Sequence, residues 1–300
     1  MSTQHSPRFV FYAHHKCASS WINRFLWHVT LVMGVKHFSF HSDEQAGGDI
    51  IQESRRMGLE AITVRNARWD HWQGFKGVPG VHLIRDPRDV IVSGYFSHLK
   101  SHRLLDDPEL AAERKMLERM SREEGLIASM DGINGRTVRD LGAWRYGEAE
   151  GVLELRLEEV SSDSESALRG ILEHAGWLGE DTRGATVATG GIWRWLHRVW
   201  RHIGQRGPLY RRFDQISESE FQRVCGLVSF ERLSGGRQRG ETDIRSHYRR
   251  GVHGDWVNHF SPEVESAFKK AFPGLVSGLG YEKDESWSAR EERFDALRSG

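Results

Sequence analysis

The chain has 300 residues, of which 38% are hydrophobic and 28% charged, and this composition excludes a disordered or collagen-like protein. Its 42 basic residues balance 42 acidic ones, so no global electric field attracts nucleic acid or an anionic membrane. Two cysteines, Cys17 and Cys225, are too few for a disulfide framework or a cysteine-based zinc site. Because the sequence contains neither a secretory signal nor a membrane-spanning apolar stretch, we expect a soluble, cytoplasmic protein without a nucleic-acid partner.

Short runs of β-forming apolar residues predict four buried strands, at 9–13, 61–64, 81–84 and 152–157. Apolar residues at helical spacing follow the first run at 21–33, and a helical stretch follows the third run at 88–100. Strands separated by helices of this length predict one α/β domain over residues 1–300, with a parallel sheet flanked by helices. Ligands bind beyond the carboxyl ends of such strands, so we expect the loops after Ala13 and Ile84 to share one cleft.

The loop after the first strand reads His-His-Lys-Cys-Ala-Ser-Ser-Trp at 14–21. Its small residues let the backbone approach a ligand, and Ser19 and Ser20 begin a helix whose N-terminus attracts anions. Lys16 adds a positive charge, so the loop predicts a phosphate site. The alternative is an ordinary capped helix with a surface lysine. The triphosphate-binding pattern GxxxxGK[ST] is absent.

The loop after the third strand places Arg85 at the strand end and Ser93 two turns into the next helix. A guanidinium and a hydroxyl in this arrangement can hold one phosphate between them. Asp86 and Asp89 also favour a helix start, so the alternative is a simple strand-to-helix connection with local ion pairs.

Three ordered motifs resemble those of the cytosolic-type sulfotransferases that use 3′-phosphoadenosine 5′-phosphosulfate (PAPS). The first loop is similar to the family's 5′-phosphosulfate loop, Lys-Ser-Gly-Thr-Thr-Trp, and Arg85 with Ser93 resembles its 3′-phosphate motif. The segment 248–260, Tyr-Arg-Arg-Gly-Val-His-Gly-Asp-Trp-Val-Asn-His-Phe, resembles the signature Arg-Lys-Gly-x-x-Gly-Asp-Trp-Lys-Asn-x-Phe. The resemblance extends over residues 9–281.

The resemblance implies a P-loop-like nucleotide-binding fold and transfer of a sulfuryl group from PAPS to a hydroxyl or amine of a small-molecule acceptor, without a metal. The released product would be 3′,5′-ADP (PAP). Lys16 would stabilise charge on the leaving phosphate. The nucleotide would be held by the residues that match the motifs, which are Lys16, Cys17, Ala18, Ser19, Ser20, Trp21, Arg85, Ser93, Ser229, Phe230, Arg249, Arg250 and Gly251.

Two departures from the family pattern affect the chemistry. The family's Tyr-Glu-Asp-Leu is Leu-Glu-Glu-Val here, at 157–160, so its tyrosine is missing. Many members carry a histidine base in Lys-Thr-His, but the matching place holds Asn66 or a neighbour, and an amide cannot accept a proton. We take His41 as the base because it follows a β-like stretch and lies close in sequence to Asp43. Other candidates are Asp70, His71 and His98.

Two other kinds of protein remain as alternatives: a nucleotide-dependent kinase, and a protein that binds the nucleotide without turnover. The missing triphosphate-binding pattern disfavours the kinase. His98 and His102 have a spacing that suits metal ligation, but no third ligand is evident in the sequence and we expect no metal.

Residues 176–212 form a Trp- and Arg-rich insertion that the motifs do not explain. Within it, 192–203 has one apolar and one basic helical face. We favour a helix packed on the core over a lid or acceptor wall, and contact with an anionic membrane is the least favoured interpretation. The sequence does not indicate the oligomeric state.

Overall fold

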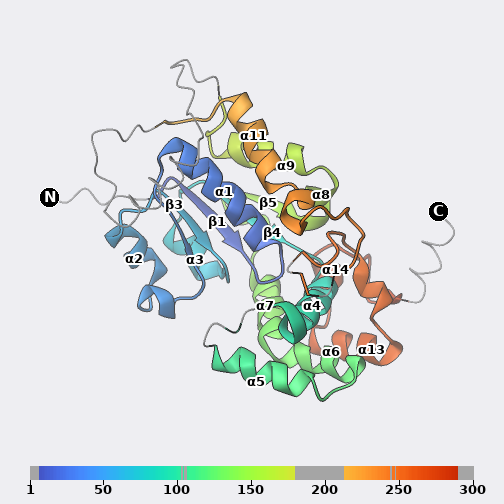
Figure 1. Cartoon of the computed structure of the whole chain (residues 1–300). Coiled ribbons are helices and arrows are strands. Elements are labelled where there is room, and N and C mark those ends of the chain that lie inside the picture. The colour runs from blue at the N-terminus through green and yellow to red at the C-terminus, as the bar shows by residue number, and fades with distance from the viewer. Residues whose placement is uncertain are drawn as a thin grey trace.

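The computed structural model describes residues 7–102, 104, 107–179, 213–243, 245–246 and 248–289. At its centre is a sheet of five parallel strands in the order β2-β3-β1-β4-β5 (Figure 1). The strands are β1 (Phe9–Ala13), β2 (His37–Phe40), β3 (Ala61–Val64), β4 (Gly80–Ile84) and β5 (Val152–Arg156). The predicted parallel α/β fold is confirmed, and β2 extends it by an edge strand. Because β2 pairs with one neighbour only, most of its residues are half-buried, and its sequence signal is correspondingly weak.

Helices flank the sheet on both faces and pack in a second group below β4 and β5 (Figure 1). In chain order they are α1 (Ser19–Met33), α2 (Ile50–Arg56), α3 (Trp69–Gly74), α4 (Pro87–Phe96), α5 (Pro108–Leu117), α6 (Arg122–Asp131), α7 (Ile133–Ala143), α8 (Leu157–Ser162), α9 (Ser164–His174), α11 (Glu218–Val228), α12 (Phe230–Ser234), α13 (Pro262–Ala271) and α14 (Leu275–Gly278). Short turns are η1 (Glu44–Ala46), η2 (Ser97–Ser101) and η3 (Asp255–Asn258). Within the described ranges no helix is long and apolar enough to cross a bilayer.

The helix predicted at 88–100 is divided in the structure. The α-helical part, α4, ends at Phe96, and η2 continues it as a π-helical turn. The amide N–H of His102 donates to the carbonyl of Ser97, five residues earlier, at 2.7 Å. Single π-helical turns often occur at functional sites, and this turn determines where two histidines of the cavity wall lie.

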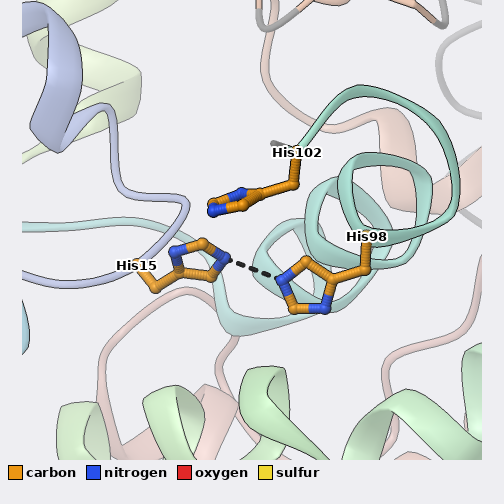
Figure 2. A group of neighbouring side chains, drawn as sticks. All are labelled: His15, His98 and His102. Carbon is orange, nitrogen blue, oxygen red and sulfur yellow. Dashed lines mark hydrogen bonds between the residues drawn. The ribbon is translucent and has the colours of Figure 1, made fainter. Parts of the chain in front are cut away.

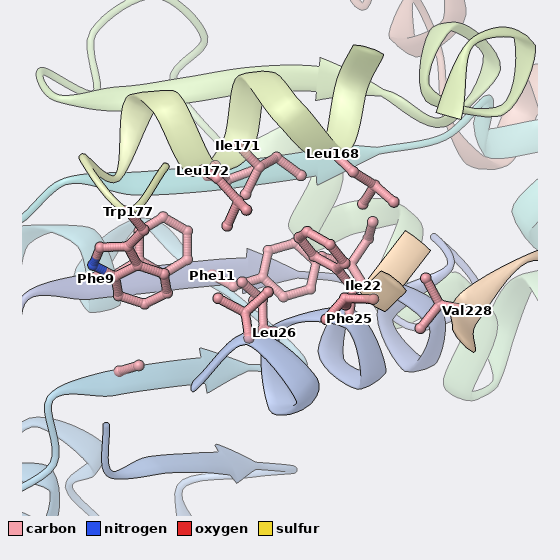
Figure 3. Close-up of a cluster of buried hydrophobic side chains, with 14 of the residues drawn as sticks. Phe9, Phe11, Ile22, Phe25, Leu26, Leu168, Ile171, Leu172, Trp177 and Val228 are labelled. Atoms are coloured by element: carbon pink, nitrogen blue, oxygen red, sulfur yellow. The ribbon is translucent and has the colours of Figure 1, made fainter. Parts of the chain in front are cut away.

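Strand β1 is buried on both faces, which explains its uninterrupted apolar sequence. Phe9 and Phe11 pack into a cluster with residues of α1, α9 and α11 (Figure 3). Val10 and Tyr12 point to the opposite face and a separate cluster. Trp177 joins the first cluster, with its ring centroid 4.9 Å from that of Phe9, so the start of the 176–212 insertion packs on the core. The rest of the insertion, including 192–203, lies outside the described residues.

A buried arginine fastens the C-terminal part of the chain to the start of α4. The guanidinium of Arg88 lies 3.7 Å from the ring centroid of Trp256 and 4.7 Å from that of Trp287. It also pairs with Asp86 and with Glu282, at 2.7 Å each. These contacts hold the segment 248–260 beside the loop that follows β4.

Candidate active site

A cavity of about 870 Å³ is lined by the loops that follow β1, β3 and β4. This volume suits a small organic ligand. Of the residues predicted for the site, the cavity is lined by Lys16, Ala18, Ser19, Ser20, Trp21, His41, Arg85, Ser93, Phe230, Arg249, Arg250 and Gly251. The two loops that were expected to share a cleft therefore do so.

Two predicted nucleotide-binding residues have side chains that point elsewhere. The Cys17 side chain is fully buried in the core cluster around α4, and burial raises the pKa of its thiol to about 12. The hydroxyl of Ser229 caps α12 by accepting the N–H of Arg232 at 3.3 Å. Any contact of Cys17 with a ligand is therefore made by its backbone.

The loop before α1 is strained at two places. Lys16 and Ala18 have φ angles of 65° and 53°, in the left-handed region that favours glycine. Each such residue costs roughly 1–2 kcal/mol, and strain of this kind clusters where proteins clamp ligands. Helix α1 begins at Ser19 without a side-chain cap, so the N–H groups of its first turn suit an anion.

The Lys16 ammonium lies among like charges. Burial, together with the charges of Arg85 and Arg249, lowers its pKa to about 7. The Arg85 guanidinium donates to the carbonyl of Lys16 at 3.2 Å, so the two cations are held beside one another. A bound anion would relieve this repulsion, because an opposite charge favours the protonated amine.

A buried carboxylate joins the segments that carry these cations. Asp89 pairs with Arg85 at 3.3 Å. It also accepts the backbone N–H groups of Gly254 and Trp256, at 2.8 and 2.9 Å. Asp89 is only 1% exposed, so its charge needs these partners. One side chain thus fixes the end of β4 against the segment that contains the other two arginines.

Asp255 orients Arg249 and Arg250. Its carboxylate accepts from Arg249 at 2.5 Å and from Arg250, and also from His259 and Asn258. Burial alone would raise the pKa of Asp255, but the hydrogen bond from His259 and the charge of Arg249 outweigh it and hold the pKa well below its usual range. The ionised carboxylate keeps both guanidinium groups at the cavity wall.

Two aromatic residues line the cavity near the end of α11. The indole N–H of Trp21 donates to the carbonyl of Val228 at 2.8 Å. The Phe230 ring lies against Gly251, where an added Cβ would be 2.3 Å from Cε2 of Phe230. Gly251 also has a φ of 69°, so both the backbone and the ring require glycine there.

The predicted base, His41, lines the cavity, but Asp43 does not orient it. The carboxylate of Asp43 instead accepts from Arg68 at 2.8 Å and from His71 at 3.1 Å. The expectation that Asp43 serves His41 is therefore wrong. Burial and the charge of Arg65 lower the pKa of His41, so its imidazole is neutral near pH 7 and its ring can still accept a proton.

The other candidate bases differ in their access to the cavity. Nδ1 of His71 accepts the backbone N–H of Arg68 at 3.1 Å, and Nε2 faces Asp43 as a donor, so neither nitrogen is left to take a proton. Asp70 is not part of the cavity wall. His98 does line the cavity and lies 3.0 Å from Nε2 of His15. His15, which the sequence did not connect with His98 and His102, therefore lies beside them in the structure.

The sequence pattern indicated no role for Arg65, which directly follows β3. Its Nε donates to the hydroxyl of Ser39 at 2.8 Å, and its Nη1 donates to Ser20 at 3.4 Å. Asn66, at or next to the place where many family members carry a histidine, donates to the carbonyl of His41 at 2.9 Å. A cation at a strand end was visible in the sequence, but its contact with the first loop depends on the pairing of β3 with β1.

The fold resembles that of the mouse sulfotransferase SULT7A1 complexed with PAP, with a TM-score of 0.52. The similarity covers 92% of this chain and 88% of that chain, at 15% sequence identity. No family model and no curated protein matches the sequence. The likeness therefore establishes a shared fold.

The strained loop gives a prediction for stability. Ala18→Gly should raise the free energy of unfolding by about 1 kcal/mol, because glycine adopts the left-handed conformation without the Cβ penalty. Chemical denaturation of both proteins measures the change. The matched control is Ala175→Gly, at a position with φ of −74°, which should lower stability. A less stable Ala18→Gly protein would contradict the assigned strain.

Proposed function

We propose that the protein transfers a sulfuryl group from PAPS to a hydroxyl or amine of a small-molecule acceptor and releases 3′,5′-ADP. The observation that carries this proposal is the meeting of Lys16, Arg85, Arg249 and Arg250 around one cavity. The fold shared with a PAP-bound sulfotransferase supports it. The acceptor would occupy the part of the cavity lined by His41 and the neighbouring polar side chains.

The arginines are suited to the 3′-phosphate. Arg249 and Arg250 are each anchored by Asp255, and each guanidinium retains further donors for a phosphate. Arg85 approaches from the β4 side, and Ser93 contributes a hydroxyl from the cavity wall. Bidentate contacts between guanidinium and phosphate are strong and directional, so this group would distinguish a 3′-phosphorylated nucleotide from one without it.

Lys16 is suited to the leaving group. The acceptor oxygen or nitrogen forms a bond to sulfur while the bond from sulfur to the bridging oxygen breaks, and the electron pair stays on the phosphate. The ammonium of Lys16 stabilises that charge as it develops. Because Lys16 is held in the first loop at a strained φ of 65°, its backbone position is fixed before the ligand binds.

His41 is the proposed proton acceptor. Its lowered pKa keeps the imidazole neutral near pH 7, and it lines the same cavity as Lys16. Asn66 and Gln45 hold its backbone through hydrogen bonds at 2.9 and 2.7 Å. A neutral imidazole can take the acceptor's proton as the new bond to sulfur forms.

A magnesium-dependent kinase is less well supported. Both oxygens of Asp86 accept from Arg88, and both oxygens of Asp89 accept backbone N–H groups. These carboxylates flank the strand-end Arg85 but are committed to structural contacts. These two carboxylates beside Arg85 are therefore not free to bind the Mg²⁺ that a kinase requires.

The first prediction from the proposed function concerns the nucleotide. We expect 3′,5′-ADP to bind at least ~100-fold more tightly than 5′-AMP, since charged hydrogen bonds contribute about 1.5–3 kcal/mol each. Isothermal titration calorimetry measures both affinities. Arg250→Met should weaken 3′,5′-ADP binding but not 5′-AMP binding, whereas Arg245→Met, at an exposed residue outside the cavity wall, should change neither. Equal affinities for the two nucleotides would remove the proposed 3′ site.

The second prediction concerns Lys16. Lys16→Ala should lower kcat on the order of 10²–10³-fold, because the cation stabilises charge mainly in the transition state. Its effect on the affinity for 3′,5′-ADP should be much smaller. Steady-state kinetics at saturating PAPS, with an acceptor found by screening with sulfate-labelled PAPS, make the comparison. Normal turnover by this variant would exclude the proposed role of Lys16.

The third prediction concerns the base. His41→Ala should lower kcat by about 10²–10⁴-fold while the affinity for 3′,5′-ADP stays the same. Asp70→Asn, outside the cavity wall, is the control and should keep the wild-type rate. Both rates come from the same labelled assay. A His41→Ala protein that keeps most of its activity would show that the proton leaves by another route.

A further inference from the structure

Three histidines gather at one side of the cavity. His15 lies in the loop after β1, His98 in η2, and His102 directly after η2; Figure 2 shows their rings turned toward one another. One ring nitrogen from each lies within 4.8 Å of the others. Nε2 of His15 and Nε2 of His98 are 3.0 Å apart. Two zinc-bound nitrogens at tetrahedral angles would be separated by about 3.3 Å, so little movement would admit an ion.

The backbone around these residues is held firmly. Arg114 on α5 donates from Nε to the carbonyl of His98 at 2.6 Å and from Nη2 to the carbonyl of His102 at 2.5 Å. The π-helical turn places the His98 and His102 ring centroids 5.7 Å apart and nearly perpendicular. Both rings are thereby brought to His15, whose centroid lies 5.2 and 5.4 Å from theirs.

A buried carboxylate stands behind His98. Nδ1 of His98 lies 3.1 Å from Oε1 of Glu113, and both side chains are buried. A carboxylate in this position holds the proton on Nδ1 and leaves the Nε2 lone pair directed toward His15. Metal-binding histidines commonly have such a carboxylate, which orients the ring and increases its basicity.

His102 gives an independent indication that an ion binds at this cluster. Its Nδ1 is buried and has no hydrogen-bond partner among the described residues. A buried polar nitrogen without a partner is costly, and an ion is one means of satisfying it.

We propose that His15, His98 and His102 bind one divalent transition-metal ion, preferably Zn²⁺, which favours imidazole nitrogen and four-coordinate geometry. Three protein ligands leave one coordination position, and it opens to the cavity that all three residues line. Structural zinc sites use four protein ligands, whereas sites that bind an exchangeable molecule use three. The proposed ion therefore belongs to the second kind.

The consequence for catalysis rests on the proposed function. An acceptor hydroxyl coordinated at the open position would release its proton more readily, to His41 or water. Its oxygen would then form the bond to sulfur as the bond from sulfur to the 5′-phosphate breaks. The metal site would thus complement the base in a cavity where Asn66 or a neighbour stands in the place of the expected family histidine.

The test measures metal binding alone, without nucleotide or acceptor. The full chain, freed of any histidine tag and stripped with a chelator, is titrated with Zn²⁺ by calorimetry and with Co²⁺ by visible absorption. We expect one site per chain. His102→Ala should weaken Zn²⁺ binding more than ~100-fold, and Glu113→Gln, which alters only the support of a ligand, should weaken it about 10–100-fold.

His174→Ala is the matched control, because this histidine lies at the end of α9 and bonds to the carbonyl of Gly151. It should leave the affinity unchanged. A variant lacking all three histidines shows how much binding comes from elsewhere; wild-type binding no stronger than that variant's would overturn the proposal. An unchanged Zn²⁺ affinity in His102→Ala would also overturn the proposal. Circular dichroism checks that this variant is folded like the wild type. The metal-binding measurement uses neither PAPS nor acceptor, so its result holds even if the protein does not turn over PAPS.

Discussion

The arrangement of the cavity depends on the buried carboxylate of Asp89. A single charge, almost completely removed from water, is satisfied by Arg85 and by two backbone N–H groups from a segment more than 160 residues later in the sequence. Removing either Asp89 or Arg85 would leave the other as an uncompensated buried charge, which typically costs about 3–5 kcal/mol. The same contact that stabilises the fold therefore also sets the distance between the end of β4 and the segment that contains Arg249 and Arg250.

Strands β1, β3 and β4 could be predicted from the sequence because they are buried on both faces, and the half-buried strand β5 was predicted as well. Strands β1 and β3 have the expected limits, and β4 and β5 differ from them by one residue each. The sequence pattern was least informative at β2, a half-buried edge strand of only four residues, and at η2, where the hydrogen-bonding pattern changes within a helix. A π-helical turn leaves no simple trace in apolar periodicity, since it depends on one extra residue per turn.

The candidate site could be predicted only in part. Motifs at strand ends were placed together because parallel strands end at one edge of a sheet. Contacts between side chains from distant segments were not accessible in this way. Asp43 was expected to serve His41, its neighbour in sequence, but pairs with His71 on α3. His15 lies in the loop after β1, and its contact with His98 appears only once β1 and β4 lie side by side.

The lowered pKa of Lys16 links folding to ligand and proton uptake. An ordinary lysine titrates at 10.5, and Lys16 in the folded chain at about 7, so between these values the unfolded chain holds a proton that the folded one lacks. Falling pH across this range therefore favours unfolding. An anion bound beside the amine raises the pKa again and removes the difference, so ligand and proton are taken up together. The protein gains most stability from its ligand toward the neutral end of the range.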